Sequence, residues 1–100
     1  MNQRFHVFIM TNKTHTVLYT GKTSNIVQCI SNHKAGKGGY FTQKYKVSLL
    51  VYTAEFNNEK EAAALEKKIK GGSRQKKIDL INKKNPYWKD LYFSLRKSLK

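Results

Sequence analysis

The first half of the chain holds two short runs in which hydrophobic and polar positions follow the period of a β-strand. Phe5, Val7 and Ile9 alternate with the residues between them. A polar break follows, and a second β-prone run from Val17 ends at Gly21. Two short strands on either side of a polar break predict an antiparallel hairpin.

Helical spacing follows the hairpin. Ile26, Ile30 and His33 lie at positions i, i+4 and i+7 of one stripe. Thr-Ser at residues 23–24 provides the expected N-cap, and the glycine-rich loop at 36–39 ends the helix.

Residues 47–56 form the strongest predicted strand. The run is nearly apolar on both faces, which is typical of a central strand. Asn58 and Glu61 then resemble a capping box. The helix that follows carries one stripe of Ala62, Leu65, Glu66 and Ile69.

A third helix is predicted between Ser73, its expected cap, and Asn85-Pro86, which ends it. Trp88 and Leu91 are expected to fold back onto the core, and residues 94–100 form a basic tail that frays. The order β-β-α-β-α-α predicts an α+β fold, with a small three-stranded antiparallel sheet and packed helices. Residues 1–100 are expected to form one domain with a core over about 5–91.

Charge changes the picture most. Twenty Lys and Arg against six Asp and Glu give a net charge of +14. A small domain of this charge favours a polyanionic partner, and nucleic acid is the first candidate because phosphate neutralisation releases counterions. The alternative is a basic surface that serves solubility alone.

The remaining composition narrows the setting. Aromatic residues make up 12% of the chain, which excludes a disordered basic tail. Cys29 is the only cysteine, so no intrachain disulfide forms and a reducing interior is expected. The longest apolar stretch is too short to span a bilayer. We therefore expect a cytoplasmic protein with no membrane association.

Glu66 is the most informative single position, because a carboxylate on an apolar stripe needs an ionic partner or a metal. The alternative is a glutamate at the edge of the stripe that pairs with a lysine.

His33 follows Cys29 by one helical turn. It is a candidate general acid or base, a metal ligand with Cys29, half of a Cys-His nucleophilic pair, or a histidine at the edge of the core.

Two further features are open to two interpretations. Tyr19, near the end of its strand, either presents a phenol at the rim of the sheet or packs across strands. Between residues 67 and 84 there are eight basic residues and one acid. Such a run is either a solvated helix face or part of a surface that follows phosphates.

An ordered series of short segments connects these positions. The segments are residues 5–9, 16–21, 25–33, 41–42, 45, 50–52, 66–67, 69–71, 73–74, 76–77 and 85–91. Over residues 5–91 the series resembles the GIY-YIG nuclease family, in its small single-domain bacterial branch similar to the N-terminal nuclease of excinuclease C.

The resemblance implies hydrolysis of a phosphodiester bond in DNA with a single divalent ion, Mg²⁺ or Mn²⁺. Glu66 matches the family's glutamate and would hold the metal, which stabilises charge on the leaving oxygen. Tyr19 matches the tyrosine of the second motif and is a candidate base for the attacking water. Lys22 is placed to activate that phenol or to contact phosphate, and His33 is the other candidate for proton transfer.

Two positions depart from the family pattern. Phe8 stands where the first motif usually has a tyrosine, and Cys29 stands where the catalytic arginine belongs. Losing one such charge-stabilising donor typically costs about 10²–10³ in rate. Lys22 or Lys34 is a candidate replacement for the charge, although a lysine lacks the planar fork of arginine.

The sequence therefore predicts an impaired or altered DNA endonuclease, or a nucleic-acid-binding domain on the same fold that does not cut. A protein-interaction remnant of the fold is the third hypothesis, and RNA is the alternative to DNA as partner. A bacterial, nucleoid-associated protein is expected. The predicted nucleic-acid contacts are Lys22, Lys34, Lys37, Lys44, Arg74, Lys76 and Lys77.

Overall fold

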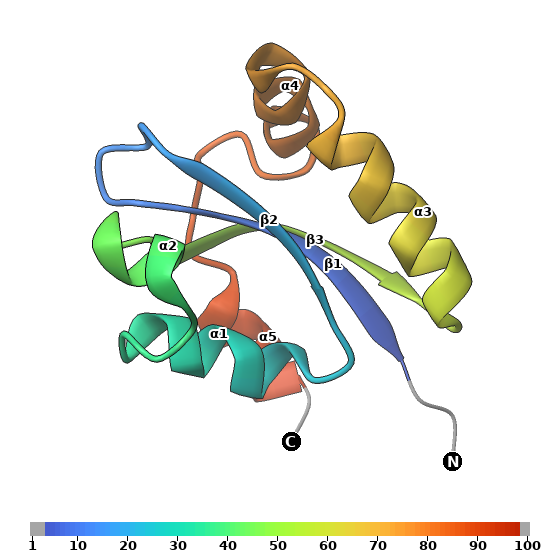
Figure 1. Cartoon of the computed structure of the whole chain (residues 1–100), viewed down its shortest axis with the longest axis horizontal. Helices are drawn as coiled ribbons and strands as arrows, with labels where there is room; N and C mark the ends of the chain where they lie inside the picture. The colour runs from blue at the N-terminus through green and yellow to red at the C-terminus, as the bar shows by residue number, and fades with distance from the viewer. Residues whose placement is uncertain (1–3, 99–100) are drawn as a thin grey trace.

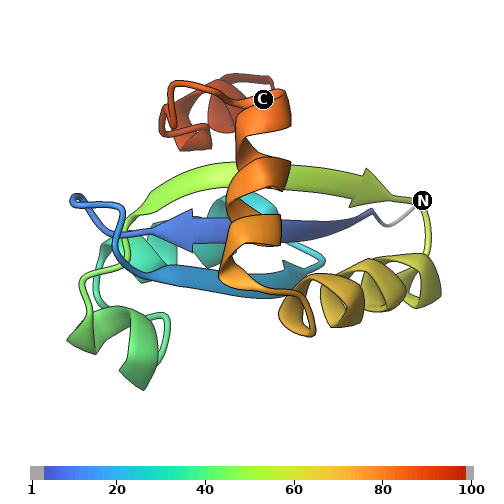
Figure 2. The same cartoon turned by 90° about the horizontal axis from the view of Figure 1, so that it is seen from above.

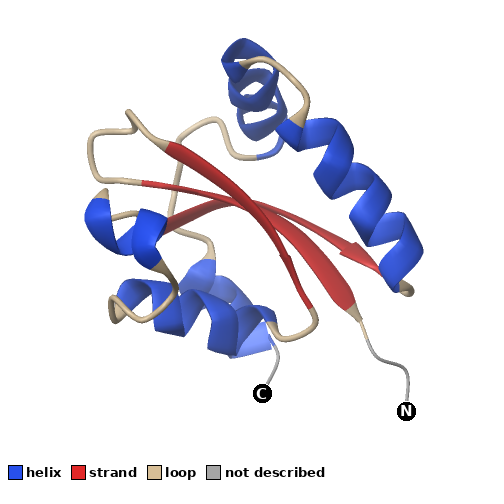
Figure 3. Ribbon diagram, viewed as in Figure 1, coloured by secondary structure: helices blue, strands red, loops and turns tan. Residues whose placement is uncertain are grey.

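Three antiparallel strands form the centre of the protein. The computed structural model describes residues 4–98. Strands β1 (Phe5–Thr11), β2 (Leu18–Thr23) and β3 (Leu49–Phe56) pair in the order β2-β1-β3 (Figures 1 and 3). The predicted α+β class and the hairpin of the first two strands are confirmed.

Helices cover both faces of this sheet. On one face lie α1 (Ile26–Lys34) and α5 (Tyr92–Ser98), and on the other lie α3 (Glu59–Lys70) and α4 (Arg74–Lys84) (Figure 1). The short α2 (Tyr40–Lys44) follows the glycine-rich loop. Figure 2 shows α2 and α3 on the β2 side of the sheet, toward opposite ends of that strand.

The expectation that residues 47–56 form the central strand is wrong. The central strand is β1, and β3 lies at one edge of the sheet and begins at Leu49. Helices cover both faces of β3, so an edge strand here shows the two-sided apolar pattern of a central one. A register shift beside Ile9 adds to this pattern, because it brings both Val51 and Tyr52 into one cluster.

Two hydrophobic clusters, one on each face, hold the layers together. The cluster under α3 and α4 is built mainly from Val7, Ile9, Val51, Tyr52, Ala62, Ile69 and Ile81. The cluster under α1 and α5 is built mainly from Phe8, Met10, Ile26, Ile30, Val47, Leu50 and Tyr92. Alternate residues of β1 therefore serve opposite cores. As expected, Trp88 and Leu91 pack back onto these clusters.

The helix starts agree with the sequence in two cases and differ in one. Asn58 accepts from the Glu61 amide and Ser73 accepts from the Lys76 amide, as predicted. The cap of α1 is Asn25, not residues 23–24. The side chain of Thr23 instead accepts from the amide of Asn25 at 3.0 Å, so it supports the true cap.

Two helices were not predicted. The five residues of α2 are too short to show a helical stripe. Residues 94–98 were expected to belong to a fraying tail but lie in α5, because Tyr92 and Leu95 bury apolar surface against the second cluster. Residues 99–100 of that predicted tail lie outside the described part of the chain.

Asp90 connects three elements by its carboxylate. Its Oδ1 accepts from the amides of Leu50 (3.2 Å) and Tyr92 (3.1 Å), and its Oδ2 pairs with Lys34 Nζ. The same ammonium donates to the carbonyl of Ser48 at 2.8 Å. This carboxylate thus ties α1, the start of β3 and α5 together.

Gly21 lies inside β2, although it was expected to end the strand. It pairs with Phe8 across the hairpin, and a Cβ built on Gly21 would lie 2.5 Å from Cζ of Phe8. The ring of Phe8 therefore occupies the space that any larger residue at position 21 needs.

We expect Gly21→Ala to lower the free energy of unfolding by about 1–3 kcal/mol, because overpacking moves the ring or the strand. Gly71→Ala is the matched control, since its Cβ would meet only backbone oxygens, at 3.4 Å or more. Urea unfolding of both variants checks this. Equal stabilities would contradict the close approach of Phe8.

Candidate functional site

Tyr19 lies at the exposed edge of the sheet, where rings from three other elements surround it. Its centroid lies 5.5 Å from that of His33, 6.3 Å from that of Phe8 and 5.8 Å from that of Phe41. These neighbours come from α1, β1 and α2. The sequence-predicted positions Phe8, Tyr19 and His33 are therefore brought together, and Phe41 joins them.

His33 is the buried member of this group, at 6% exposure. Its Nδ1 lies 2.8 Å from the hydroxyl of Thr42 in α2. A Cβ on Gly38 would lie 1.9 Å from the same nitrogen, so the glycine-rich loop closes directly over the ring. Burial lowers the pKa of His33, which keeps the imidazole neutral at pH 7.

An open recess of about 370 Å³, here called the β2 cleft, lies along the outer side of β2. Its walls are Leu18, Tyr19, Thr20, Phe41, Lys70 and Lys77. Strand β2, α2, the end of α3 and the start of α4 thus meet at one place. Tyr19 lines this cleft, whereas His33 does not.

Glu66 lies one helical turn before Lys70. Its Oε2 is 3.2 Å from Lys70 Nζ, and its side chain is 20% exposed. The carboxylate is therefore at the edge of the apolar stripe and paired with a lysine, which is the alternative that the pattern left open. Since Lys70 also lines the β2 cleft, this ion pair places Glu66 next to Tyr19's recess.

A metal ion at this place would have one carboxylate from the protein. Residues 4–98 hold no cluster of three or more His, Cys, Asp or Glu side chains that could bind a metal together. A lone carboxylate fits Mg²⁺, which keeps several waters and takes oxygen ligands from a substrate phosphate. The side chain of Glu66 is 20% exposed, so its carboxylate is reachable from solvent and fits this use.

Two lysines predicted to replace the missing arginine are engaged elsewhere. Lys22 Nζ lies 3.5 Å from Glu59 Oε2. Lys22 and Tyr19 are three residues apart in β2, so their side chains point to opposite faces of the sheet. Lys34 is tied to Asp90. Neither lines the β2 cleft, whereas Lys70 and Lys77 do.

Cys29 stays outside the cleft and packs at the border of the second cluster. Burial raises the pKa of its thiol, which keeps the sulfur protonated at neutral pH. The interpretation of Cys29 as a thiolate nucleophile therefore loses its support. A metal site of Cys29 with His33 would lack a third His, Cys, Asp or Glu ligand among residues 4–98.

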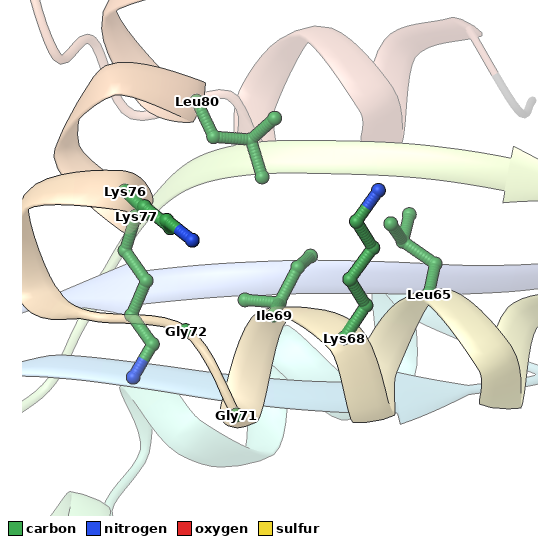
Figure 4. Close-up of a pocket in the computed structure, with 8 residues that line it drawn as sticks. All are labelled: Leu65, Lys68, Ile69, Gly71, Gly72, Lys76, Lys77 and Leu80. Atoms are coloured by element: carbon green, nitrogen blue, oxygen red, sulfur yellow. The ribbon is translucent and has the colours of Figure 1, made fainter.

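The other predicted nucleic-acid contacts fall into two groups. Lys37 and Lys44 are exposed near α2. Arg74, Lys76 and Lys77 lie at the start of α4, where Arg74 donates to the carbonyl of His15 at 3.1 Å. A groove of about 290 Å³ between α3 and α4 has apolar Leu65, Ile69 and Leu80 with Lys68, Lys76 and Lys77 around them (Figure 4). Lys77 belongs to both this groove and the β2 cleft.

The sequence missed Lys70, Phe41 and Thr42 as members of the site. All three stand within the segments that match the family, but a segment match does not say which side chains meet. The i, i+4 spacing of Glu66 and Lys70 is the local signal that could have indicated their ion pair.

Comparison with known proteins shows the family of this chain. Residues 4–79 match the family model of the GIY-YIG catalytic domain. A UPF0213 protein of Staphylococcus haemolyticus is 37% identical over 81 residues, covering 81% of this chain and 98% of the relative. A UPF0213 protein of Natronomonas pharaonis is 34% identical over 76 residues, covering 76% and 88%.

One solved structure is also similar, the solution NMR structure of a UPF0213 protein from Bacillus halodurans. It has a TM-score of 0.57 and 31% identity, with 87% of this chain and 92% of the other covered. The match to the family model thus defines a nuclease-type domain. The chain belongs to the GIY-YIG family, and the relatives above place it beside the small UPF0213 proteins. No helix in residues 4–98 is long and apolar enough to cross a membrane.

We expect stability to fall at acidic pH. Burial lowers the pKa of both His6 and His33 from the usual 6.5, so the unfolded chain binds protons on these rings more readily than the folded one. Their contribution is complete above about pH 6.5 and is lost as the pH falls through the folded pKa values. Urea unfolding at about pH 7.5 and pH 5 measures this loss. His33→Asn should reduce it, and an unchanged loss would show that His33 takes no part.

Proposed function

We propose that this protein is a DNA endonuclease that hydrolyses phosphodiester bonds in the β2 cleft. The observation that carries the proposal is the Glu66–Lys70 ion pair of 3.2 Å, because Lys70 lines the same recess as Tyr19. A phenol and two ammonium groups thus line one open recess, and the carboxylate of Glu66 is paired with one of those ammonium groups. That combination suits a phosphate ester attacked by water.

Tyr19 is the candidate to take a proton from the attacking water, since it lines the cleft and His33 does not. His33 then acts as a positioning residue. Its buried ring packs against Tyr19, and its contact with Thr42 holds α2, which carries Phe41 onto the ring of Tyr19. The phenol therefore has two rings packed against it before substrate arrives.

Glu66 would hold the divalent ion, Mg²⁺ or Mn²⁺, whose chemistry is to stabilise charge on the leaving oxygen. Lys70 and Lys77 are the candidates for the charge that an arginine at position 29 would supply, because they line the cleft. Each offers a point charge, so transition-state stabilisation is weaker than with a guanidinium fork.

A nucleic-acid-binding domain that does not cut is the second candidate function. Two observations favour it. Phe8 has no hydroxyl, and the Cys29 side chain packs at the border of an apolar cluster without a charge to offer. DNA is the proposed partner in both cases, with RNA as the alternative, and a cytoplasmic, nucleoid-associated location follows from that partner.

Purified protein with Mg²⁺ or Mn²⁺ should nick supercoiled plasmid, and Glu66→Ala should lower the rate by at least about 10²-fold, because it removes the metal ligand. Tyr19→Phe should lower the rate by about 10²–10⁴-fold while DNA binding persists. Asp79→Ala, an exposed acid on α4, is the matched control and keeps the rate. Equal cleavage by wild type and Glu66→Ala would identify a contaminant and refute the endonuclease.

The double variant Phe8→Tyr with Cys29→Arg should cut faster than wild type, because it restores a hydroxyl and a guanidinium at two positions where the family has them. Single-turnover cleavage with each single variant as reference measures the gain. No gain in a double variant that folds and binds DNA would show that the site differs from the family pattern beyond these two positions.

A further inference from the structure

Exposed aromatic rings lie beside the β2 cleft on residues 40–45, here called the α2 segment, which are helix α2 and its C-cap Tyr45. Tyr40, Phe41 and Tyr45 are 68%, 44% and 43% exposed. The ring of Phe41 stacks on Tyr19 at an interplanar angle of 28°, and its centroid lies 4.8 Å from that of Tyr45. A series of rings therefore runs from Tyr19 in the cleft to the outer surface of α2.

Lys44 places a positive charge among these rings. Its Nζ lies 5.7 Å from the centroid of Tyr40 and 5.4 Å from that of Tyr45. The cation–π contacts hold the ammonium close to two exposed faces without an ion pair. Aromatic faces next to cations are the arrangement on which proteins stack bases while pairing with the adjacent phosphates.

Charge favours a nucleic acid over an apolar protein surface as the occupant. All six Asp and Glu residues lie at position 55 or later, while residues 1–54 contain seven Lys and Arg. The α2 segment therefore belongs to a stretch of chain without any carboxylate that could repel phosphate. An apolar protein surface would gain nothing from this charge, whereas a polyanion would.

We propose that α2 is a stacking platform for unpaired nucleotides of the DNA strand whose phosphate lies in the β2 cleft. In a duplex, neighbouring base pairs cover both faces of each base, so only an unpaired base offers a face to Tyr40 and Tyr45. The inference rests on the proposed function and adds the substrate class, which is DNA with a single-stranded segment beside the bond that is cut.

Fluorescence anisotropy in EDTA tests the platform without cleavage, using a labelled strand of roughly 20 nucleotides alone and paired with its complement. Wild type should bind the single strand more tightly. Tyr40→Ala and Tyr45→Ala should each weaken that binding by roughly 5- to 150-fold, the measured range for losing one stacking ring, and leave duplex binding unchanged. Tyr40→Phe and Tyr45→Phe keep the ring and should bind as wild type.

The control is Tyr87→Ala, because Tyr87 is 82% exposed and lies outside the α2 segment and the cleft. It should change neither affinity. Equal binding of both probes by wild type, or an equal loss on both in the alanine variants, would overturn the platform. If the plasmid assay still shows nicking that depends on Glu66, the endonuclease stands and the platform alone is wrong. If neither probe binds at low salt, both proposals are wrong.

Discussion

The burial of β1 on both faces is the constraint on which the rest of the structure depends. Successive side chains of β1 enter opposite cores, and Val7, Ile9 and Met10 are fully buried. In a sheet of three strands only the central strand has two neighbours. The central strand β1 therefore lies under the helix layer of each face. Strand β2 is then an edge with open space beside it, which is where the cleft forms.

The same constraint explains the chemistry of the site. An edge strand offers side chains to both faces and its rim to solvent, so Tyr19 reaches rings on the α1 side while Lys70 approaches from α3. Layers of helices from opposite faces can converge only around such an edge. The ring of Phe8, which is one of the rings around Tyr19, also packs closely against Gly21 of the same strand.

Much of the fold could be predicted from sequence, because its signals are local. The caps at Asn58 and Ser73 and the helix end at Asn85 depend on residues within a few positions of each other. The hairpin depends on two strands that are close in the sequence. Strand order could not be predicted this way, since an edge strand covered on both faces has the pattern of a central one. Helix α5 was not predicted either, because its burial depends on partners that are distant in the sequence.

In the candidate site too, the sequence indicates local features but not contacts between residues that are distant in the chain. Residue type and spacing drew attention to Tyr19, His33 and Glu66, the family resemblance implied their roles, and the structure places the rings of the first two in contact. The engagement of Lys22 and Lys34 in ion pairs could not be predicted, because their partners Glu59 and Asp90 lie 37 and 56 residues away. Charge in a sequence shows how many cations exist but not which remain available to a ligand.

The Asp90 carboxylate also sets an order of assembly during translation. The buried members of the cluster under α3 and α4 lie between Val7 and Ile81, so all of them are synthesised before Asp90. The ammonium of Lys34 and the amide of Leu50 must wait for residue 90, and Tyr92 completes their cluster later still. The side of the nascent domain under α3 and α4 can therefore begin to pack before residue 90 is synthesised, while the side that supports His33 and α2 cannot close until that residue is available.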